Sequence, residues 1–188
     1  GSTGTKDISM VAIGGLTDSR KNISGLIDVF GEMHNQVPTA VLNIVRPVPD
    51  QLLYDKAMQT GLLNRKIFFH DYLSNDQVYH LLSACSFLVV NSISETFSMA
   101  AAEALACGKP VISTRCGGPE EFISEERGIL IDLNNDKQLS DAIMRMCNTF
   151  RSYDPVKLNQ FARDHFSEEI VGKKLLELYE DMIAQRSQ

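Results

Sequence analysis

The sequence predicts an α/β fold in which six parallel strands form a doubly wound sheet with helices on both faces. Short apolar runs such as Phe87–Val90 lack polar alternation, which is the pattern of a strand buried on both faces. Segments with helical periodicity separate these runs, as βαβ units require. The 188 residues are 44% hydrophobic and 22% charged, which is the ordinary balance of a globular domain able to bury such a sheet.

Local signals mark the ends of elements in the first half of the chain. Gly14 and Gly15 end the first strand, and Gly61 ends the second helix. Residues Ser74–Gln77 form a capping box that starts the third helix. The expected elements are strand 8–14, a helix with apolar positions from 23 to 33, strand 40–45, helix 50–60, strand 66–72 and a helix through 82.

The second half continues the alternation and ends in helices. Gly108 and Pro110 end an alanine-rich helix, and Ser167 caps the last helix of the chain. The expected elements are strand 87–90, the alanine-rich helix, strand 111–114, a short helix after 119, strand 128–133, and helices 136–150, 155–165 and 168–185.

The stretch Asn91–Pro110 carries the strongest functional signal. Glu95 lies in a loop ahead of the alanine-rich helix, and Glu103 lies eight positions later inside it. Free backbone N–H groups around Phe97–Met99, with the positive end of the helix dipole, suit phosphate or sugar oxygens. Two carboxylates would repel bare phosphate but accept hydroxyl groups, so we expect a nucleotide or sugar nucleotide. The alternative is that both are ordinary solvated carboxylates, although the alanines around Glu103 predict close packing in which its carboxylate needs a partner.

The topology brings two loops to the same crevice. In the strand order 3-2-1-4-5-6, the first and fourth strands are neighbours at the switch point, where ligands bind. The loops after these strands are 14–22 and 92–98. We therefore expect the glycines and Lys21 to lie beside Glu95 and the start of the alanine-rich helix.

Composition restricts the class of protein further. A net charge of −6 argues against a general nucleic-acid binder. No apolar run approaches the roughly 20 residues that span a bilayer, and no signal peptide is visible, so a cytoplasmic location is expected. Residues 1–5 are interpreted as a tag remnant and lead, and 6–188 as a single domain. The cysteines are too widely spaced for a zinc site and suit a reduced state: Cys85, Cys107, Cys116 and Cys147.

Glu95 and Glu103 form an E-x7-E motif within ETFSMAAAEALACGKPVIST, which is followed by Cys116-Gly117-Gly118-Pro119. This arrangement resembles the C-terminal, donor-binding half of the GT-B retaining glycosyltransferases of family 4, or group 1. The resemblance extends from about residue 8 to residue 183 and implies a Rossmann-like domain that binds a nucleotide sugar.

The resemblance also implies roles for individual residues. Glu95 and nearby backbone N–H groups would hold the donor sugar, Glu103 the ribose hydroxyls, and Lys21 the diphosphate leaving group. The segment His70–Tyr72 would flank the base, largely through backbone groups. The expected donor-binding residues are Gly14, Gly15, Arg20, Lys21, His70, Tyr72, Glu95, Thr96, Phe97, Ser98, Met99 and Glu103, with Lys21 and Glu95 also catalytic.

Two departures from the family pattern concern the diphosphate. The family usually has an arginine where this chain has Gly15, so one of two expected cations is missing. The second strand commonly ends in a glycine pair, whereas here it ends in Arg46-Pro47. Either Arg20 or Arg46 is a candidate replacement cation.

The resemblance implies a hexosyltransferase-type enzyme that uses a nucleotide-diphosphate sugar without a cofactor or metal. The N-terminal acceptor-binding half is absent, so the chain alone is expected to transfer no sugar, and any peripheral membrane association would come through that half. The main alternative is a degenerate, non-catalytic nucleotide-binding module. A nucleotide-sugar epimerase is a second enzyme alternative, and a flavodoxin-like or response-regulator domain fits less well. The base, the sugar and the acceptor stay open.

Overall fold

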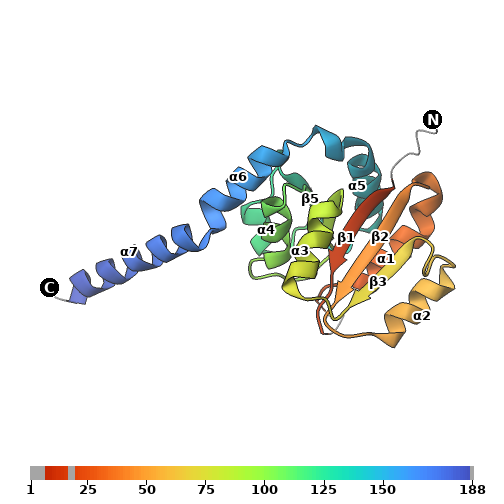
Figure 1. Cartoon of the computed structure of the whole chain (residues 1–188), viewed down its shortest axis with the longest axis horizontal. Helices are drawn as coiled ribbons and strands as arrows, with labels where there is room; N and C mark the ends of the chain where they lie inside the picture. Colours follow the sequence, from red (N-terminus) through yellow and green to blue (C-terminus); the bar gives the residue numbers. More distant parts are fainter. Residues whose placement is uncertain (1–6, 17–19, 187–188) are drawn as a thin grey trace.

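The computed structural model describes residues 7–16 and 20–186 and contains one six-stranded parallel sheet (Figure 1). The strand order is β3-β2-β1-β4-β5-β6, which confirms the predicted topology and places β1 beside β4. The residues interpreted as a tag remnant, 1–5, lie outside the described part of the chain. The strands are β1 (Ile8–Ile13), β2 (Ala40–Arg46), β3 (Ile67–Asp71), β4 (Phe87–Val90), β5 (Val111–Thr114) and β6 (Gly128–Ile131).

Helices cover both faces of the sheet. One face packs on α1 (Ile23–Met33), α2 (Gln51–Gln59) and α5 (Asp136–Thr149). The other face packs on α3 (Asn75–Ala84), α4 (Met99–Ala106) and α6 (Pro155–Phe166). The remaining helical elements are η1 (His34–Gln36), η2 (Gly118–Glu121), η3 (Phe150–Ser152) and α7 (Glu168–Arg186).

The strand sequences have no polar alternation because each strand contributes to two cores. In β1, Met10 and Ala12 pack in the core under α1 and α5. Val11, between them, packs in the core under α3 and α4. All three side chains are fully buried, as the sequence predicts for a central parallel strand.

The capping signals in the sequence correspond to observed helix ends. Ser74 and Gln77 form the predicted capping box of α3. Gly61 and Gly108 have φ values of 71° and 70°, the left-handed conformation that follows many helices. The last strand is shorter than predicted, because the Gln138 side chain binds the backbone N–H of Asp132 at 2.7 Å and ends the strand there.

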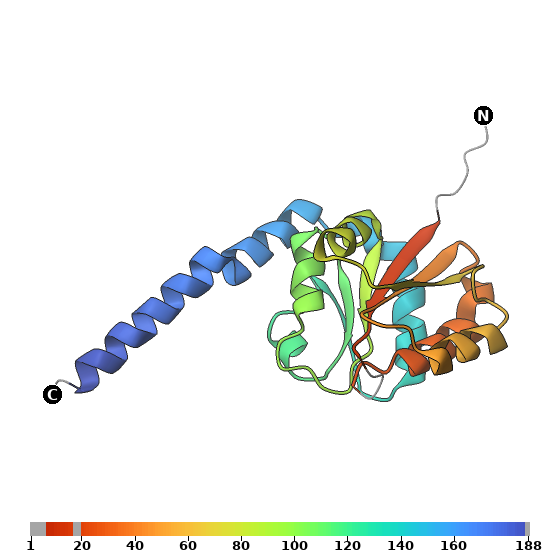
Figure 2. The same ribbon diagram turned by 60° about the horizontal axis from the view of Figure 1, so that its bottom comes forward.

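Helix α7 extends away from the rest of the molecule (Figure 2). It contacts α6, and several of its apolar side chains are exposed: Val171, Leu175, Leu176, Tyr179, Met182 and Ile183. The side chain of Leu178, expected on the apolar face of this helix, lies outside the described part. Within the described residues, no helix combines the length and apolar character needed to cross a membrane.

Candidate functional site

A pocket of about 370 Å³ lies at the carboxyl end of β1 and β4, where the topology predicts a ligand. Its wall includes seven of the predicted site residues: Lys21, Glu95, Thr96, Phe97, Ser98, Met99 and Glu103. It also includes Ile13, Asn75, Val78 and Ala100, which the sequence analysis did not assign. Asn75 and Val78 could have been predicted from the sequence, since the capping box at Ser74 starts α3 at this edge of the sheet.

Lys21 and Glu95 meet across the pocket. The Lys21 Nζ lies 2.6 Å from Glu95 Oε1, and the Ser92 hydroxyl donates to the same oxygen at 2.6 Å. The side chains of Lys21 and Glu95 are only 21% and 10% exposed, so solvent screens the pair less than a surface ion pair. The lysine of the first loop and the carboxylate of the fourth-strand loop are thus brought together as predicted.

Backbone contacts fasten these two loops to each other. Ile93 donates its N–H to the carbonyl of Arg20 at 2.7 Å. The Asn91 side-chain amide donates to the carbonyl of Asn22 at 3.1 Å, and Asn22 caps α1 by accepting from Gly25. The position of Lys21 is therefore fixed relative to β4 rather than being that of a free surface side chain.

The start of α4 presents unpaired hydrogen-bond donors to the pocket. Ser98 is the N-cap, with φ 72° and ψ 76°, and its buried hydroxyl has no partner in the part of the chain that the structure describes. Within the same residues, the backbone N–H groups of Phe97, Met99 and Ala100 also have no acceptor. A buried hydroxyl is normally satisfied, and the first N–H groups of a helix have no acceptor within the helix, so this group forms a seat for an acceptor oxygen.

Glu103 lies on the outer side of α4 rather than in the close-packed setting that the alanines predicted, and its need for a partner stays a prediction. The alanines of α4 are buried against the sheet, whereas Glu103 is exposed. Among the described residues its carboxylate has neither a hydrogen bond nor an ion pair, although its backbone carbonyl accepts from the N–H of Cys107 at 3.0 Å. Its carboxylate faces the pocket, and partial burial there raises its pKa above the ordinary value for glutamate. An unpaired carboxylate on the pocket wall is available to accept hydroxyl groups.

The loop that carries Glu95 is clamped by the segment after β5. Glu95 donates its N–H to Cys116 at 2.8 Å and accepts from Gly118 at 2.9 Å. A Cβ on Gly118 would lie 2.4 Å from the Cα of Phe97, so only glycine fits there. Gly117 and Gly118 belong to the motif that follows the E-x7-E stretch in the sequence, but the packing role of Gly118 is visible only in the structure.

Five other predicted residues lie off the pocket wall, and their binding roles stay predictions. The Tyr72 side chain is 69% exposed beyond β3, with φ 60°. The His70 imidazole is held by the Asn43 side chain at 2.8 Å, and burial lowers its pKa although Asp71 acts in the opposite direction. Arg20 is exposed, and Gly14 and Gly15 form the turn at the end of β1.

The structure rules out Arg46 as a cation that points into the pocket. Its side chain is fully buried beneath the turn after β1. It donates to the carbonyls of Val48 and Leu16 and lies 3.3 Å from a carboxylate oxygen of Asp50. Its Nη1 has no partner among the described residues and lies 3.4 Å from where a Gly14 Cβ would be. Arg46 therefore supports the turn from below.

The described residues contain no cluster of histidine, cysteine, aspartate or glutamate side chains suited to a metal ion. Cys107, on the side of α4 that faces α3, has its thiol pKa raised by burial, which is the behaviour of a packing residue.

Relatives of known sequence are glycosyltransferases. The chain is 30% identical over 136 residues to D-inositol 3-phosphate glycosyltransferase of Saccharomonospora viridis, a match that covers 70% of this chain and 31% of the relative. It is 43% identical over 88 residues to an uncharacterized glycosyltransferase of Methanocaldococcus jannaschii, covering 46% and 23% of the two chains. The matches thus take in less than a third of each relative.

Solved structures share the fold. Sucrose-phosphate synthase of Thermosynechococcus elongatus superimposes with a TM-score of 0.83 at 25% identity, over 96% of this chain and 47% of that one. Anabaena HepE, solved with UDP and glucose, superimposes with a TM-score of 0.80 at 19% identity, over 94% and 49%. These likenesses confirm the Rossmann-like fold of a GT-B half.

The family comparison covers most of the molecule. Residues 4–160 match the family described as "Glycosyl transferases group 1", a range that includes the whole pocket wall. The chain therefore belongs to the group 1 glycosyl transferase family.

Proposed function

We propose that this chain is the nucleotide-sugar donor-binding domain of a retaining, hexosyltransferase-type glycosyltransferase. The observation that carries the proposal is the pocket itself. It combines the Lys21–Glu95 pair, the unpaired donors at the start of α4 and the free carboxylate of Glu103. A cation and N–H groups suit a diphosphate, and two carboxylates suit the hydroxyls of two sugars. A sugar nucleotide carries both kinds of group.

In this proposal each residue has a distinct task. Lys21 leaves Glu95 and neutralises the phosphate charge that grows as the glycosidic bond breaks. Glu95 accepts hydrogen bonds from the hydroxyl groups of the transferred sugar, and the N–H groups of Phe97 and Met99 donate to phosphate or sugar oxygens. Glu103 accepts the ribose hydroxyls. The His70–Tyr72 segment flanks the base. All of these groups contact the donor, and the transferred sugar keeps its anomeric configuration in the product.

The proposal assigns the acceptor to a second half of the enzyme. The matched solved chains are about twice as long as this one, which spans 47% and 49% of two of them. We propose that an N-terminal acceptor-binding half packs on this domain and that the apolar side of α7 contributes to that contact. The isolated chain is then expected to bind donor without transferring sugar.

The decisive test is nucleotide binding by the isolated chain. A thermal-shift titration with UDP, GDP and ADP should raise the melting temperature with at least one of them. A ligand at about a hundred times its Kd stabilises by roughly 2.7 kcal/mol. The Glu103→Ala variant should lose the shift, whereas Glu32→Ala, which removes an exposed carboxylate from α1, should keep it.

One observation favours a degenerate binding module as the second candidate. Lys21 is the only cationic side chain on the described pocket wall, since Gly15 has no side chain and Arg46 is buried elsewhere. If none of the three nucleotides shifts the melting temperature, the donor proposal fails, and a degenerate domain that keeps the fold but has lost nucleotide binding is favoured.

The proposed site uses Lys21 rather than a metal to neutralise the diphosphate. Nucleotide affinity should therefore be the same in EDTA as in millimolar Mg²⁺, measured by calorimetry at constant ionic strength. A loss of affinity in EDTA would contradict this part of the proposal.

A further inference from the structure

A cluster of aromatic rings connects the pocket to the point where α6 gives way to α7. The ring of Phe97 lies 5.1 Å from that of Phe166 and 5.4 Å from that of Phe122. The Phe122 and Phe166 rings are 5.1 Å apart, so the three form a closed triangle. Phe161 extends the cluster along α6, 5.7 Å from Phe166. Edge-on and tilted rings at these separations attract one another, which gives the cluster a defined geometry.

Phe97 joins this cluster to the donor seat. It lies on the pocket wall and directly precedes Ser98, whose left-handed backbone aims the start of α4 at the pocket. A serine in this conformation is strained and persists only when its surroundings hold it. Gly118 presses on the backbone of Phe97, while Phe122 and Phe166 fix its ring. The Phe97 side chain therefore contributes to holding the N–H groups in position.

Phe166 is the last residue of α6, and the chain changes direction immediately after it. Ser167 is extended, with φ −65° and ψ 150°, and α7 begins at the next residue. The direction of α7 is thus set next to a ring that touches Phe97.

Helix α6 packs against both ends of α4. At the carboxyl end of α4, Gly108 lies against Pro155, and the Asn159 side chain donates to the carbonyl of Ala106. At the amino end, Phe166 contacts Phe97. Because α6 runs the whole length of α4, a displacement of α6 acts directly on the helix that carries the donor seat.

We propose that Phe166 is a positioning residue that couples the direction of α7 to the geometry of the donor seat. A contact that reorients α7 then changes the order of the backbone from Glu95 to Met99 through Phe166 and Phe97. The effect of this coupling on nucleotide affinity rests on the proposed donor-binding function; the coupling between the two segments does not.

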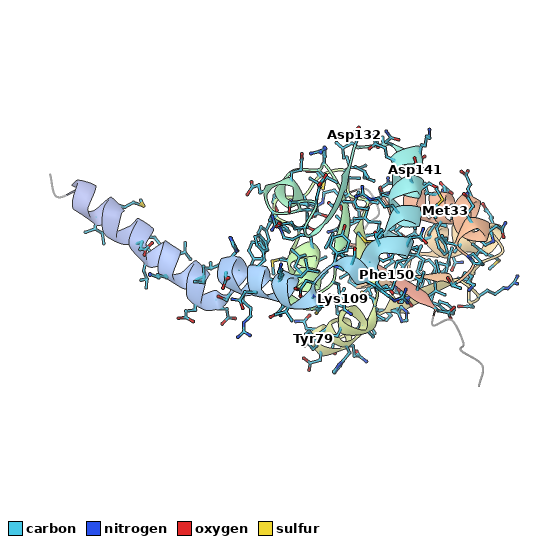
Figure 3. All side chains as sticks on the ribbon, turned by 90° about the horizontal axis from the view of Figure 1, so that it is seen from above. Met33, Tyr79, Lys109, Asp132, Asp141 and Phe150 are labelled. Atoms are coloured by element: carbon cyan, nitrogen blue, oxygen red, sulfur yellow. The ribbon has the colours of Figure 1, made fainter. Side chains whose placement is uncertain are left out.

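The test compares Phe166→Ala with Phe150→Ala. Phe150 directly follows the end of α5 (Figure 3) and is half-buried, but it packs on Phe87 at 6.5 Å and belongs to the core on the opposite face of the sheet. Phe166→Leu serves as the conservative variant, since it keeps apolar volume at the position. Hydrogen–deuterium exchange is measured on ligand-free protein, and UDP, GDP and ADP affinities are measured by calorimetry.

Phe166→Ala should raise the exchange rate of the hydrogen-bonded amides at this site, those of Glu95, Ala101 and Ala102, roughly two- to tenfold, since that is the equilibrium effect of losing an aromatic pair. Phe150→Ala should leave these amides at the wild-type rate even if it lowers the melting temperature. Phe166→Leu should restore most of the protection. For whichever nucleotide the wild type binds, Phe166→Ala should weaken affinity by a similar factor.

Unchanged exchange at the amides of Glu95, Ala101 and Ala102 in folded Phe166→Ala would overturn the proposal, as would an equal increase in Phe150→Ala. If the wild type binds none of the three nucleotides, the donor-binding function fails but the exchange data still decide the coupling.

Discussion

Ser98 combines two unfavourable features at one position. Its φ of 72° is a conformation that non-glycine residues rarely adopt, and its hydroxyl is buried without a partner among the described residues. Such features are retained where a ligand completes the site. The Ser98→Gly variant removes both and should raise the free energy of unfolding by about 1 kcal/mol.

The same variant should bind nucleotide more weakly, because the hydroxyl and the preset helix start are lost. Urea unfolding and calorimetry on one preparation measure both effects. A variant that is destabilised, or that binds as well as wild type, would show that the strain at Ser98 has no connection with the pocket.

The loop after β1 carries two cationic side chains, one on the pocket wall and one on the surface. Lys21 lines the pocket and pairs with Glu95, whereas the Arg20 side chain is exposed. Lys21→Met should weaken diphosphate binding tenfold or more, the usual value of a charge-assisted contact of about 1.5–3 kcal/mol. Arg20→Met should change the Kd less than about twofold at physiological salt. Equal losses in the two variants would make Arg20 the replacement cation that the sequence left open.

The raised pKa of Glu103 predicts that the stability of the protein depends on pH. Burial raises its pKa in the folded protein above the unfolded value, so its charged form is disfavoured by folding. Its contribution is most favourable below the unfolded pKa and is lost as pH rises through the folded pKa. Glu103→Gln should therefore melt slightly higher than wild type at pH 7, and the difference should vanish toward pH 4. Thermal melts across this range measure it, and a lower melting temperature at pH 7 would contradict the burial argument.

At the scale of elements, two glycines that end helices offer a matched pair. Gly61 and Gly108 have nearly the same φ, but a Cβ on Gly61 meets nothing within 4 Å, while one on Gly108 lies 2.9 Å from Pro155. Gly61→Ala should cost about 1 kcal/mol for the backbone conformation alone. Gly108→Ala should cost roughly 1–2 kcal/mol more, because α6 must move off α4. Chemical unfolding of the two variants isolates the packing cost.

The elements themselves were largely predictable because they depend on local signals. Buried strands, capping residues and helix-ending glycines can each be recognised from a few neighbouring residues. The strand order followed from the commonest doubly wound topology. The pairing of Lys21 with Glu95 followed from that order, since it places their loops side by side. Seven of the predicted site residues consequently share one pocket wall.

What could not be predicted depends on side-chain direction and on contacts distant in sequence. Arg46 is indistinguishable by sequence from a pocket cation, yet it points to the opposite face of its strand and pairs with Asp50. Glu103 lies among alanines in the sequence, but the helix turns it away from the buried alanine face toward the pocket. The contact of Phe97 with Phe166 joins residues nearly 70 positions apart, and no local pattern announces it.

At the scale of the whole molecule, α7 contributes little to the stability of the sheet. Most of its described apolar side chains are exposed, and its packing is on α6. A chain that ends after Ser167 should therefore keep its free energy of unfolding within about 0.5 kcal/mol of the full value. Urea unfolding measures this. A chain that ends after Tyr153 is the control, since it also loses Leu158 and Ala162 from the core against α4 and should be strongly destabilised. An equal loss in both truncations would show that α7 is part of the folding unit.

A ligand that binds Lys21 or Glu95 must first break the ion pair between these two side chains. A phosphate ion alone would take Lys21 and leave Glu95 as a mostly buried charge with only the Ser92 hydroxyl as its partner. A free sugar would meet a carboxylate already neutralised. Only a molecule that presents an anion and a hydroxyl at the right separation replaces both halves of the pair at once. If the pocket is the proposed donor site, it would thereby discriminate against the abundant small anions and sugars of a cell before any base is recognised.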